Sequence, residues 1–176
     1  MSVKVGKQAP QFTTEALVGR EFKEISLQQY ADAGKWVVLF FYPMDFTFVC
    51  PTEIVEFNNN VEEFEDRDVQ VLGGSTDTVH SHLGWVKSHP DLADLKFPLF
   101  ADVKKTMTEA YDVLSDGGVA QRGTFVIDPH GVVQWAQVNS DNVGRNVAEV
   151  LRVIDALQTD ELCPCNWEKG QNTIQL

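Results

Sequence analysis

Cys50 is the residue best suited to chemistry in this chain, and it lies in the stretch FYPMDFTFVCPTEI at 41–54. Pro51 follows it directly, and proline is well tolerated in the first turn of a helix, where its missing N–H would have no partner anyway. The thiol would then face unpaired backbone N–H groups at a helix N-terminus. That position favours the thiolate, which is the nucleophilic form. The alternative is a buried structural cysteine that behaves as a small apolar residue.

Thr47 lies three residues before Cys50, in the place where a thioredoxin-type enzyme carries its second thiol. The pattern T-x-x-C cannot close a local disulfide, so an oxidised Cys50 needs a thiol from elsewhere. The remaining cysteines are Cys163 and Cys165, in the stretch ELCPCNWEKG. Thr47 can exchange a hydrogen bond with the thiol or with a substrate oxygen, or it can serve only as a turn-forming hydroxyl.

A structural zinc site is another use for these groups. The sequence CPC is too closely spaced for the usual pair of cysteine ligands. His80 and His82 lie two positions apart on a predicted helix and should face different sides of it. A redox cycle, in which a thiolate is oxidised and then met by distal thiols, fits these residues better, and we expect neither a metal ion nor a cofactor on this chain.

Arginine is the cation that such a cycle needs. A thiolate that attacks a peroxide expels hydroxide or alkoxide, and a permanently charged, forked guanidinium can stabilise that leaving group. Arg122 precedes the predicted core strand GTFVID, where a charge is unusual without a task, although a strand-end surface residue is the simpler alternative. Arg145 is expected to open a long helix, where a surface charge would be ordinary.

The elements that must position these residues alternate between strand and helix. The continuous apolar run WVVLFFY at 36–42 predicts a strand buried on both faces, and the spacing of apolar residues predicts a helix over 51–65. The other expected elements are a hairpin at 11–25, helices at 26–35, 79–89, 104–113 and 143–158, a strand at 69–76, an extended segment at 97–103, and a second hairpin at 119–138 that turns at 128–131. This order predicts an α/β fold with a central mixed sheet and a thioredoxin-like ending.

Length and composition indicate a single globular domain. The chain has 176 residues, of which 43% are hydrophobic and 23% charged, and we expect a core over 1–158 and a tail over 159–176. The net charge of −12 argues against a nucleic acid or a membrane surface as partner. An odd number of cysteines argues against a secreted disulfide framework, and no signal peptide or membrane span is visible, which predicts a cytoplasmic location.

These motifs resemble the active-site signature of the typical 2-Cys peroxiredoxins, and most closely the branch of the bacterial alkyl hydroperoxide reductase C proteins. The pattern P-x-x-x-T-x-x-C falls on Pro43, Thr47 and Cys50. The blocks GSTDT, RGTFVIDPHG, VGRNVAEVLRVIDALQ and ELCPCNWEKG follow in the same order, so the resemblance covers essentially the whole chain. It implies a thioredoxin-like fold with an added N-terminal hairpin. It also implies a thiol-dependent peroxidase that reduces hydrogen peroxide and organic hydroperoxides in antioxidant defence.

By this resemblance, Cys50 would be the peroxidatic cysteine, in a pocket shaped by Pro43 and Thr47. Its thiolate would reduce the peroxide and become a sulfenic acid. Cys163 would be the resolving cysteine, supplied by the other subunit of a homodimer. An external dithiol reductant, such as thioredoxin or a flavoprotein reductase, would reopen the intersubunit disulfide. Cys165 departs from the common pattern and is a second possible resolving thiol.

The resemblance assigns the charged residues as well. Arg122 would stabilise the thiolate and the breaking O–O bond, Arg145 would be the second arginine near the site, and Glu53 would orient the pair. The chain lacks the Gly-Gly-Leu-Gly insertion and the Tyr-Phe helix extension that promote overoxidation in many eukaryotic members. Their absence implies resistance to overoxidation.

Assembly is also an expectation from the resemblance. The strand at 131–139 would pair with its copy across a twofold axis, and such dimers would form a ring-shaped decamer through contacts near Phe46 and 76–86. Two other functions stay open at this point. One is a holdase chaperone, since ring-forming members of the family can act so. The other is a thioredoxin-like disulfide exchanger, against which the absence of C-x-x-C argues.

Overall fold

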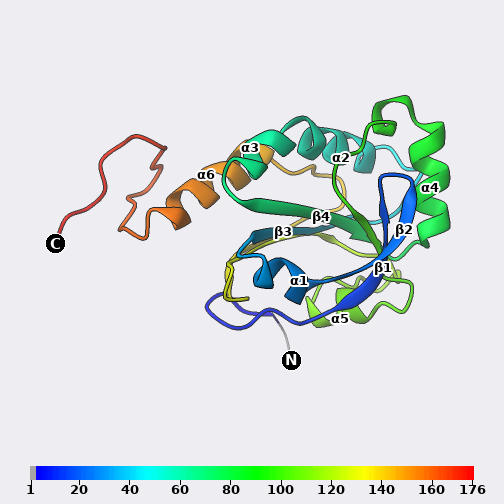
Figure 1. Ribbon diagram of the computed structural model, residues 1–176, viewed down its shortest axis with the longest axis horizontal. Coiled ribbons are helices and arrows are strands. Elements are labelled where there is room, and N and C mark those ends of the chain that lie inside the picture. The colour runs from blue at the N-terminus through cyan, green and yellow to red at the C-terminus, as the bar shows by residue number, and fades with distance from the viewer. Residues whose placement is uncertain (1–2) are drawn as a thin grey trace.

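A seven-stranded mixed sheet forms the centre of the computed structural model, which describes residues 3–176 (Figure 1). The strand order is β2-β1-β5-β4-β3-β6-β7, in which β3, β4 and β5 run parallel and all other neighbours are antiparallel. The strands are β1 (Thr13–Val18), β2 (Glu21–Ser26), β3 (Trp36–Phe41), β4 (Val69–Ser75), β5 (Leu99–Ala101), β6 (Arg122–Ile127) and β7 (Val133–Asn139). The predicted mixed α/β sheet is confirmed, and the two predicted hairpins, β1–β2 and β6–β7, form its edges.

Helices cover both faces of this sheet. In Figure 1, α2, α3 and α6 lie along one side and α1 and α5 along the other, while α4 stands beside the β1–β2 hairpin. The helices are α1 (Leu27–Asp32), α2 (Cys50–Asn59), α3 (Val61–Glu65), α4 (Val79–Ser88), the 3₁₀ helix η1 (Pro90–Leu92), α5 (Thr106–Ala110) and α6 (Val147–Gln158). No helix within residues 3–176 is long and apolar enough to cross a membrane.

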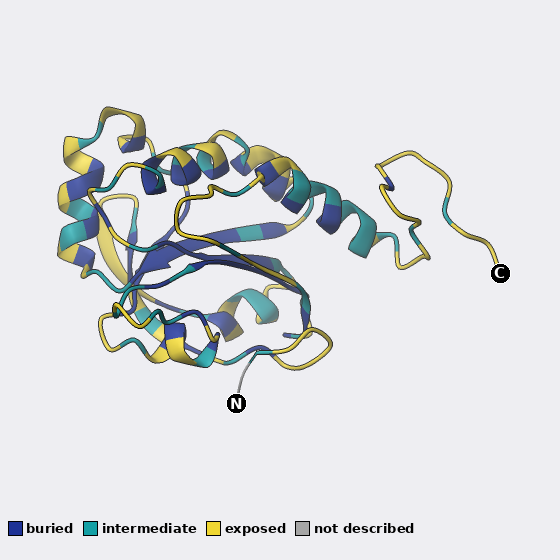
Figure 2. Ribbon diagram, turned by 180° about the vertical axis from the view of Figure 1, so that it is seen from behind, coloured by how far each residue is buried: buried dark blue, intermediate teal, exposed yellow. Residues whose placement is uncertain are grey.

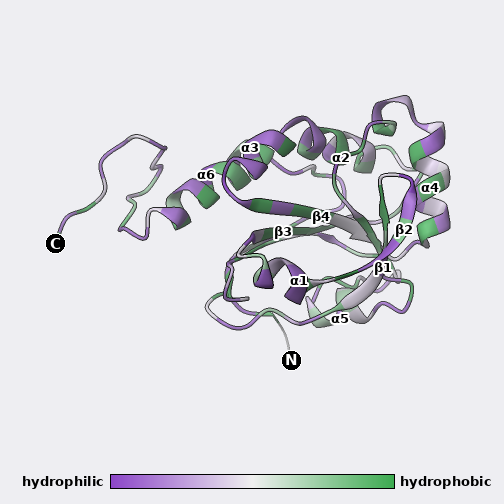
Figure 3. Ribbon diagram, viewed as in Figure 1, coloured by the Kyte–Doolittle hydropathy of each residue, from purple (hydrophilic) through white to green (hydrophobic). Residues whose placement is uncertain are grey.

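Strand β3 separates two apolar cores, because its side chains alternate between the faces of the sheet. Val38 and Phe40 belong to the core under α2, α4 and α6. Val37, Leu39 and Phe41 belong to the core on the side of α1 and α5. Each of these residues is at most 1% exposed, and Figures 2 and 3 show the central strands as both buried and hydrophobic. The prediction of a strand buried on both faces is confirmed. Residues 42–49, which lead to α2, therefore start from a strand that is packed on both sides.

Two helices differ from the expectation. The helix predicted over 51–65 is divided into α2 and α3 at Asn60, whose backbone leaves the helical region with φ −102° and ψ 11°. The side chain of Asn60 donates to the carbonyl of Glu56 at 2.8 Å, so it competes with the backbone for that acceptor. The helix predicted over 143–158 begins only at Val147, because Asn146 caps it and accepts from the N–H of Glu149. Arg145 was expected to open this helix, and that prediction is wrong: Arg145 lies in the loop before it.

Other elements lie close to their predicted places. Ser26 caps α1 and forms a capping box with Gln29. The helix expected over 104–113 is shortened to α5, because Lys105 before it adopts a left-handed φ of 61°. Residues 159–176 form neither a helix nor a strand, and this tail projects beyond the end of α6 (Figure 1).

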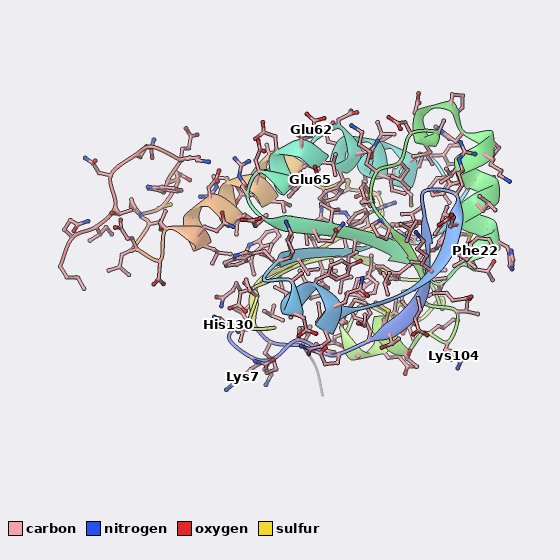
Figure 4. The ribbon with its side chains drawn as sticks, viewed as in Figure 1. Lys7, Phe22, Glu62, Glu65, Lys104 and His130 are labelled. Atoms are coloured by element: carbon pink, nitrogen blue, oxygen red, sulfur yellow. The ribbon has the colours of Figure 1, made fainter. Side chains whose placement is uncertain are left out.

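The negative charge of the chain is carried partly by solvent-exposed side chains. Figure 4 shows Glu62 and Glu65 on α3, with Lys7 and Lys104 on the opposite side of the molecule. Both glutamates are exposed. Charges in such positions are hydrated and affect solubility and association more than the fold itself.

Candidate active site

The topology brings several segments to one edge of the sheet. Strand β3 ends at this edge and continues through residues 42–49 into α2. Strand β6 begins there because it runs antiparallel to β3, and β7 ends there because it runs antiparallel to β6. The register pairs Arg122, the first residue of β6, with Asn139, the last residue of β7. The start of α2, the start of β6 and the loop after β7 therefore lie together.

Cys50 is the first residue of α2 and is fully buried, with 0% of its surface exposed. Pro51 occupies the first turn, and no side chain caps this end of the helix. The Nη1 atom of Arg122 lies 3.4 Å from the Sγ atom of Cys50. A guanidinium at this distance and the N-terminal end of a helix both favour a negative charge on the sulfur. The arrangement is suited to a thiolate nucleophile.

Glu53, one turn further along α2, connects two arginines. Its Oε2 atom accepts from Nη1 of Arg122 at 2.7 Å, and its Oε1 atom accepts from Nε of Arg145 at 3.0 Å. The backbone N–H of Arg145 also donates to Oε1, at 3.1 Å. All three side chains are at most 5% exposed. One buried carboxylate thus fixes both guanidiniums beside the thiol.

The other N–H groups of the two arginines have different partners. Arg145 donates to the carbonyl of Phe41 in β3 at 2.6 Å and to that of Gly123 in β6 at 2.8 Å. Through its bond to Glu53, it therefore connects α2 to both of these strands. Arg122 donates from Nε to the carbonyl of Asp141 at 2.7 Å. Within residues 3–176, no hydrogen bond engages Nη2 of Arg122. This nitrogen can therefore donate to an oxygen of a substrate that approaches the sulfur.

Burial acts on the two guanidiniums with different results. It lowers the pKa of Arg145, and Glu53 only partly opposes this effect. Burial also disfavours the charge of Arg122, but the hydrogen bond to Cys50 and the attraction of Glu53 and Cys50 together outweigh it and raise the pKa of Arg122. Since arginine titrates far above neutrality, both groups are cations at physiological pH.

The loop at 42–49 carries the other residues of the predicted pocket. Pro43 and Thr47 are half-buried there. The hydroxyl of Thr47 donates to the carbonyl of Met44 at 2.9 Å and so closes a turn. In the part of the chain that the structure describes, Thr47 is not a hydrogen-bond partner of Cys50. Phe46 and Phe48 are 61% and 94% exposed, so the outer side of the loop is apolar and uncovered.

A buried polar cluster behind this loop was missed by sequence reasoning. Asp45 is 3% exposed, and its carboxylate contacts the Tyr42 hydroxyl at 2.8 Å, the Ser81 hydroxyl at 2.8 Å and Nδ1 of His82 at 2.7 Å. Burial, assisted by the charge of Asp45, raises the pKa of Tyr42 well above its usual range. His82 is buried whereas His80 is exposed, which confirms that they face different sides of α4. Asp45 follows the end of β3 by four residues, and the local sequence around it does not indicate partners on α4.

Cys163 and Cys165 lie in the tail, away from this cluster. The site is at the N-terminal end of α6, and the 12 residues of this helix span about 18 Å before the tail begins. Cys163 is half-buried, with its sulfur 3.5 Å from the hydroxyl of Thr159, whereas Cys165 is exposed. All the cysteines are free thiols. The fold therefore brings Cys50, Glu53 and the two arginines together and leaves the tail thiols apart.

Arg152 on α6 connects the tail to the rest of the fold. Its Nη1 atom donates to the carbonyl of Trp167 at 2.8 Å, and Trp167 is only 3% exposed. The hydrogen bond to Glu149 raises the pKa of Arg152, and the negative charge of Glu149 acts in the same direction. Arg152, Cys163 and Cys165 line the same pocket, so a cation faces the space beside the tail thiols.

Comparison with known proteins relates nearly the whole chain to one group. The model of the AhpC/TSA family matches residues 5–136, a segment that includes Cys50, Glu53 and Arg122. Alkyl hydroperoxide reductase C of Mycolicibacterium smegmatis is 48% identical over 180 residues, which cover 97% of this chain and 92% of that protein. The chloroplastic 2-cysteine peroxiredoxin of Chattonella marina is 45% identical, with 99% and 93% covered. The crystal structure of reduced Plasmodium vivax 2-Cys peroxiredoxin matches with a TM-score of 0.92 at 40% identity and covers 97% of this chain and 92% of that one.

Proposed function

Because this chain belongs to the AhpC/TSA family and is a thiol-dependent peroxidase of the 2-Cys peroxiredoxin type, we propose that Cys50 is its peroxidatic cysteine. The observation that carries the assignment is the buried Sγ at the start of α2, 3.4 Å from Nη1 of Arg122. The thiolate attacks one oxygen of the peroxide and the O–O bond breaks. Hydroxide or alkoxide leaves, with its charge stabilised by Arg122, and Cys50 becomes a sulfenic acid.

In this proposal, the other site residues position the reacting groups. Glu53 and Arg145 keep Arg122 in place, since the buried carboxylate bonds to both guanidiniums. Pro43 and Thr47 shape the entrance to the pocket, because the turn closed by the Thr47 hydroxyl holds the loop before Cys50. No cofactor takes part in the proposed cycle, whose chemistry resides in the sulfur.

Resolution of the sulfenic acid is proposed to require a second subunit. The chain would form one domain over 1–176, with a core over 1–158 and a tail over 159–176 that carries Cys163. The tail of the same chain begins only after the 12 residues of α6, which span about 18 Å, and this supports resolution by Cys163 of a partner subunit. Its sulfur attacks the sulfenic sulfur, water leaves, and an intersubunit disulfide forms. An external dithiol reductant, such as thioredoxin or a flavoprotein reductase, then restores both thiols.

The two edge strands of the sheet support a homodimer. β2 carries Glu21, Lys23 and Glu24, and charges on an edge strand discourage pairing with another chain. β7 has the sequence VQWAQVN, without a charge, and exposes Val138 at 49%. We propose that β7 pairs with its copy across a twofold axis. A ring-shaped decamer would follow from further contacts through the exposed apolar loop that contains Phe46.

Replacing Val138 by lysine tests the proposed dimer. The Val138→Lys variant is expected to weaken the reduced dimer by at least about tenfold, because like charges near the twofold axis repel each other and must lose water. Sedimentation or elution volume at several concentrations measures the change. Glu21→Lys on the opposite edge strand is the control and should leave the association constant unchanged. A Val138→Lys protein that associates like the wild type would contradict pairing through β7.

Replacing Cys163 by serine tests the proposed resolving thiol. Without an external thiol, the Cys163→Ser variant is expected to reduce one equivalent of peroxide per subunit and then stop, because the sulfenic acid has lost its proposed resolving thiol. On a non-reducing gel it should lack the disulfide-linked dimer that the wild type forms after peroxide. Cys165→Ser, two residues away, is the matched control and should retain that dimer. The reverse pattern would identify Cys165 as the resolving cysteine.

The reductant and the cellular location are proposed more broadly. A dithiol carrier is required, because reopening a disulfide needs a thiolate and a second thiol. Steady-state turnover with purified thioredoxin and with a flavoprotein reductase would distinguish the two.

A cytoplasmic location agrees with reduced resting thiols, and fractionation of the source cells would test it, since one relative is chloroplastic.

A further inference from the structure

Residues 140–144, which follow β7, connect the two arginines of the site, although none of these five residues is buried. The Asp141 carbonyl of this loop accepts from Nε of Arg122 at 2.7 Å, and at its end the N–H of Arg145 donates to Glu53 at 3.1 Å. Residues 140–144 are all exposed. A loop without an apolar anchor depends on hydrogen bonds for its shape. The residue that supplies those bonds controls where the Asp141 carbonyl lies.

Asn139 supplies two of them from its side chain, beside a backbone bond from the N–H of Val143 to the carbonyl of Ser140 at 2.9 Å. It is the last residue of β7, and its Nδ2 atom donates to the carbonyls of Val143 at 3.3 Å and Gly144 at 3.1 Å. On its other side, the side-chain amide of Gln137 donates to Oδ1 of Asn139 at 2.7 Å. Because carbonyls can only accept, the NH₂ group of Asn139 must face them and its oxygen must face Gln137. The amide is thereby held in a single orientation.

We propose that Asn139 is a positioning residue for peroxide reduction, which acts through residues 140–144 on Arg122. The inference rests on the proposed roles of Cys50 and Arg122. The amide folds the loop back towards β6, where the Asp141 carbonyl restrains Nε of Arg122. That restraint leaves Nη1 at 3.4 Å from the sulfur of Cys50. Within residues 3–176, the side chain of Asn139 bonds only to the loop and to Gln137, so its effect on the reaction is indirect.

Two substitutions test this role through the single-turnover rate of hydrogen peroxide reduction by the reduced protein. Asn139→Ala is expected to lower the rate by about 10- to 100-fold, since a displacement of roughly 1 Å of a catalytic group has effects of that size. Asn139→Asp keeps the shape of the side chain but turns an oxygen towards two carbonyl oxygens. Asn139→Asp should lower the rate at least as much. If the alanine variant does not fold, the aspartate variant alone decides whether the inference holds.

A double-mutant cycle separates positioning from a general structural effect. In an Arg122→Ala background, Asn139→Ala is expected to lower the rate by less than about twofold, because the group through which it acts is gone. Asn58→Ala is the matched control. Its amide also bridges a loop, by bonds to the Asp94 carbonyl at 2.9 Å and the Lys96 N–H at 2.8 Å, but that loop does not touch Arg122. Its rate should stay within about twofold of the wild type in either background.

The outcomes have distinct meanings. A wild-type rate in folded Asn139→Ala or Asn139→Asp would overturn the inference and leave the proposed function intact. An equal loss in the presence and absence of the Arg122 side chain would also overturn it, because Asn139 would then act by another route. A wild-type rate in Arg122→Ala would instead contradict the proposed role of Arg122, and the inference would fall with it.

Discussion

Replacing Cys50 by serine is expected to abolish peroxide reduction, with a loss on the order of 10⁴-fold or more. The serine hydroxyl is not ionised at neutral pH, even beside Arg122, and its oxygen cannot form a sulfenic acid. The substitution changes one buried atom, so the fold should remain. Residual peroxide after mixing with the reduced protein and an excess of dithiothreitol measures the effect.

The matched control keeps Cys50 and removes the other thiols. Without dithiothreitol, a variant with both Cys163→Ser and Cys165→Ser should still consume one equivalent of peroxide per subunit at close to the wild-type rate, because neither sulfur lies near the site in its own chain. Sustained turnover by Cys50→Ser, which retains the tail thiols, would show that the reaction begins at the tail. The proposed peroxidatic role of Cys50 would then be wrong.

Replacing Glu53 by alanine is expected to give the largest loss of stability among single changes at the site. The carboxylate lies between Arg122 and Arg145, and all three side chains are at most 5% exposed. Its removal leaves two buried cations close together without a counter-charge, a situation that typically destabilises by about 3–5 kcal/mol. Urea unfolding of the reduced protein measures the change in free energy. Peroxide reduction should fall as well, since Arg122 loses the bond that orients Nη1.

Glu149 offers the control for this experiment. It also forms a carboxylate–guanidinium pair, with Arg152 at 2.6 Å, but the two side chains are 41% and 32% exposed. Exposed pairs contribute only about 0–1 kcal/mol, because water and salt screen them. Glu149→Ala should therefore change the free energy of unfolding by less than about 1 kcal/mol. Similar losses in both variants would mean that burial of Glu53 does not decide its contribution.

Local patterns predicted the sheet and the position of Cys50 at the start of a helix. The apolar run of β3 and the proline after Cys50 lie next to each other in the sequence, so they indicate a strand that runs into a helix start. Arg122 was recognisable because a charge begins an apolar strand. The break at Asn60 was not recognisable, since apolar residues keep helical spacing from Ile54 to Phe64 and both helices bury the same face.

Local sequence patterns could not predict contacts between residues that are far apart in the chain. Glu53 and Arg145 are 92 residues apart, and only the antiparallel return of β6 and β7 brings them together. Their roles therefore came from the resemblance to a family. The cluster of Asp45, Ser81 and His82 was missed for the same reason, because nothing near Asp45 in the sequence indicates a buried partner on α4. Asn139 could be identified only after the loop that it holds had been located.

Cys50 and Glu53 share the first turn of α2, which couples the two halves of the catalytic cycle. Unwinding this turn would release the sulfur towards the thiol of a partner subunit and, in the same movement, withdraw the carboxylate from both arginines. A subunit that is forming its disulfide would thus have lost the charge arrangement that we propose for the attack on peroxide. The two steps must alternate in time within each subunit. Because α2 ends at Asn60 and α3 packs separately against β4, this alternation can occur while the rest of the fold stays in place.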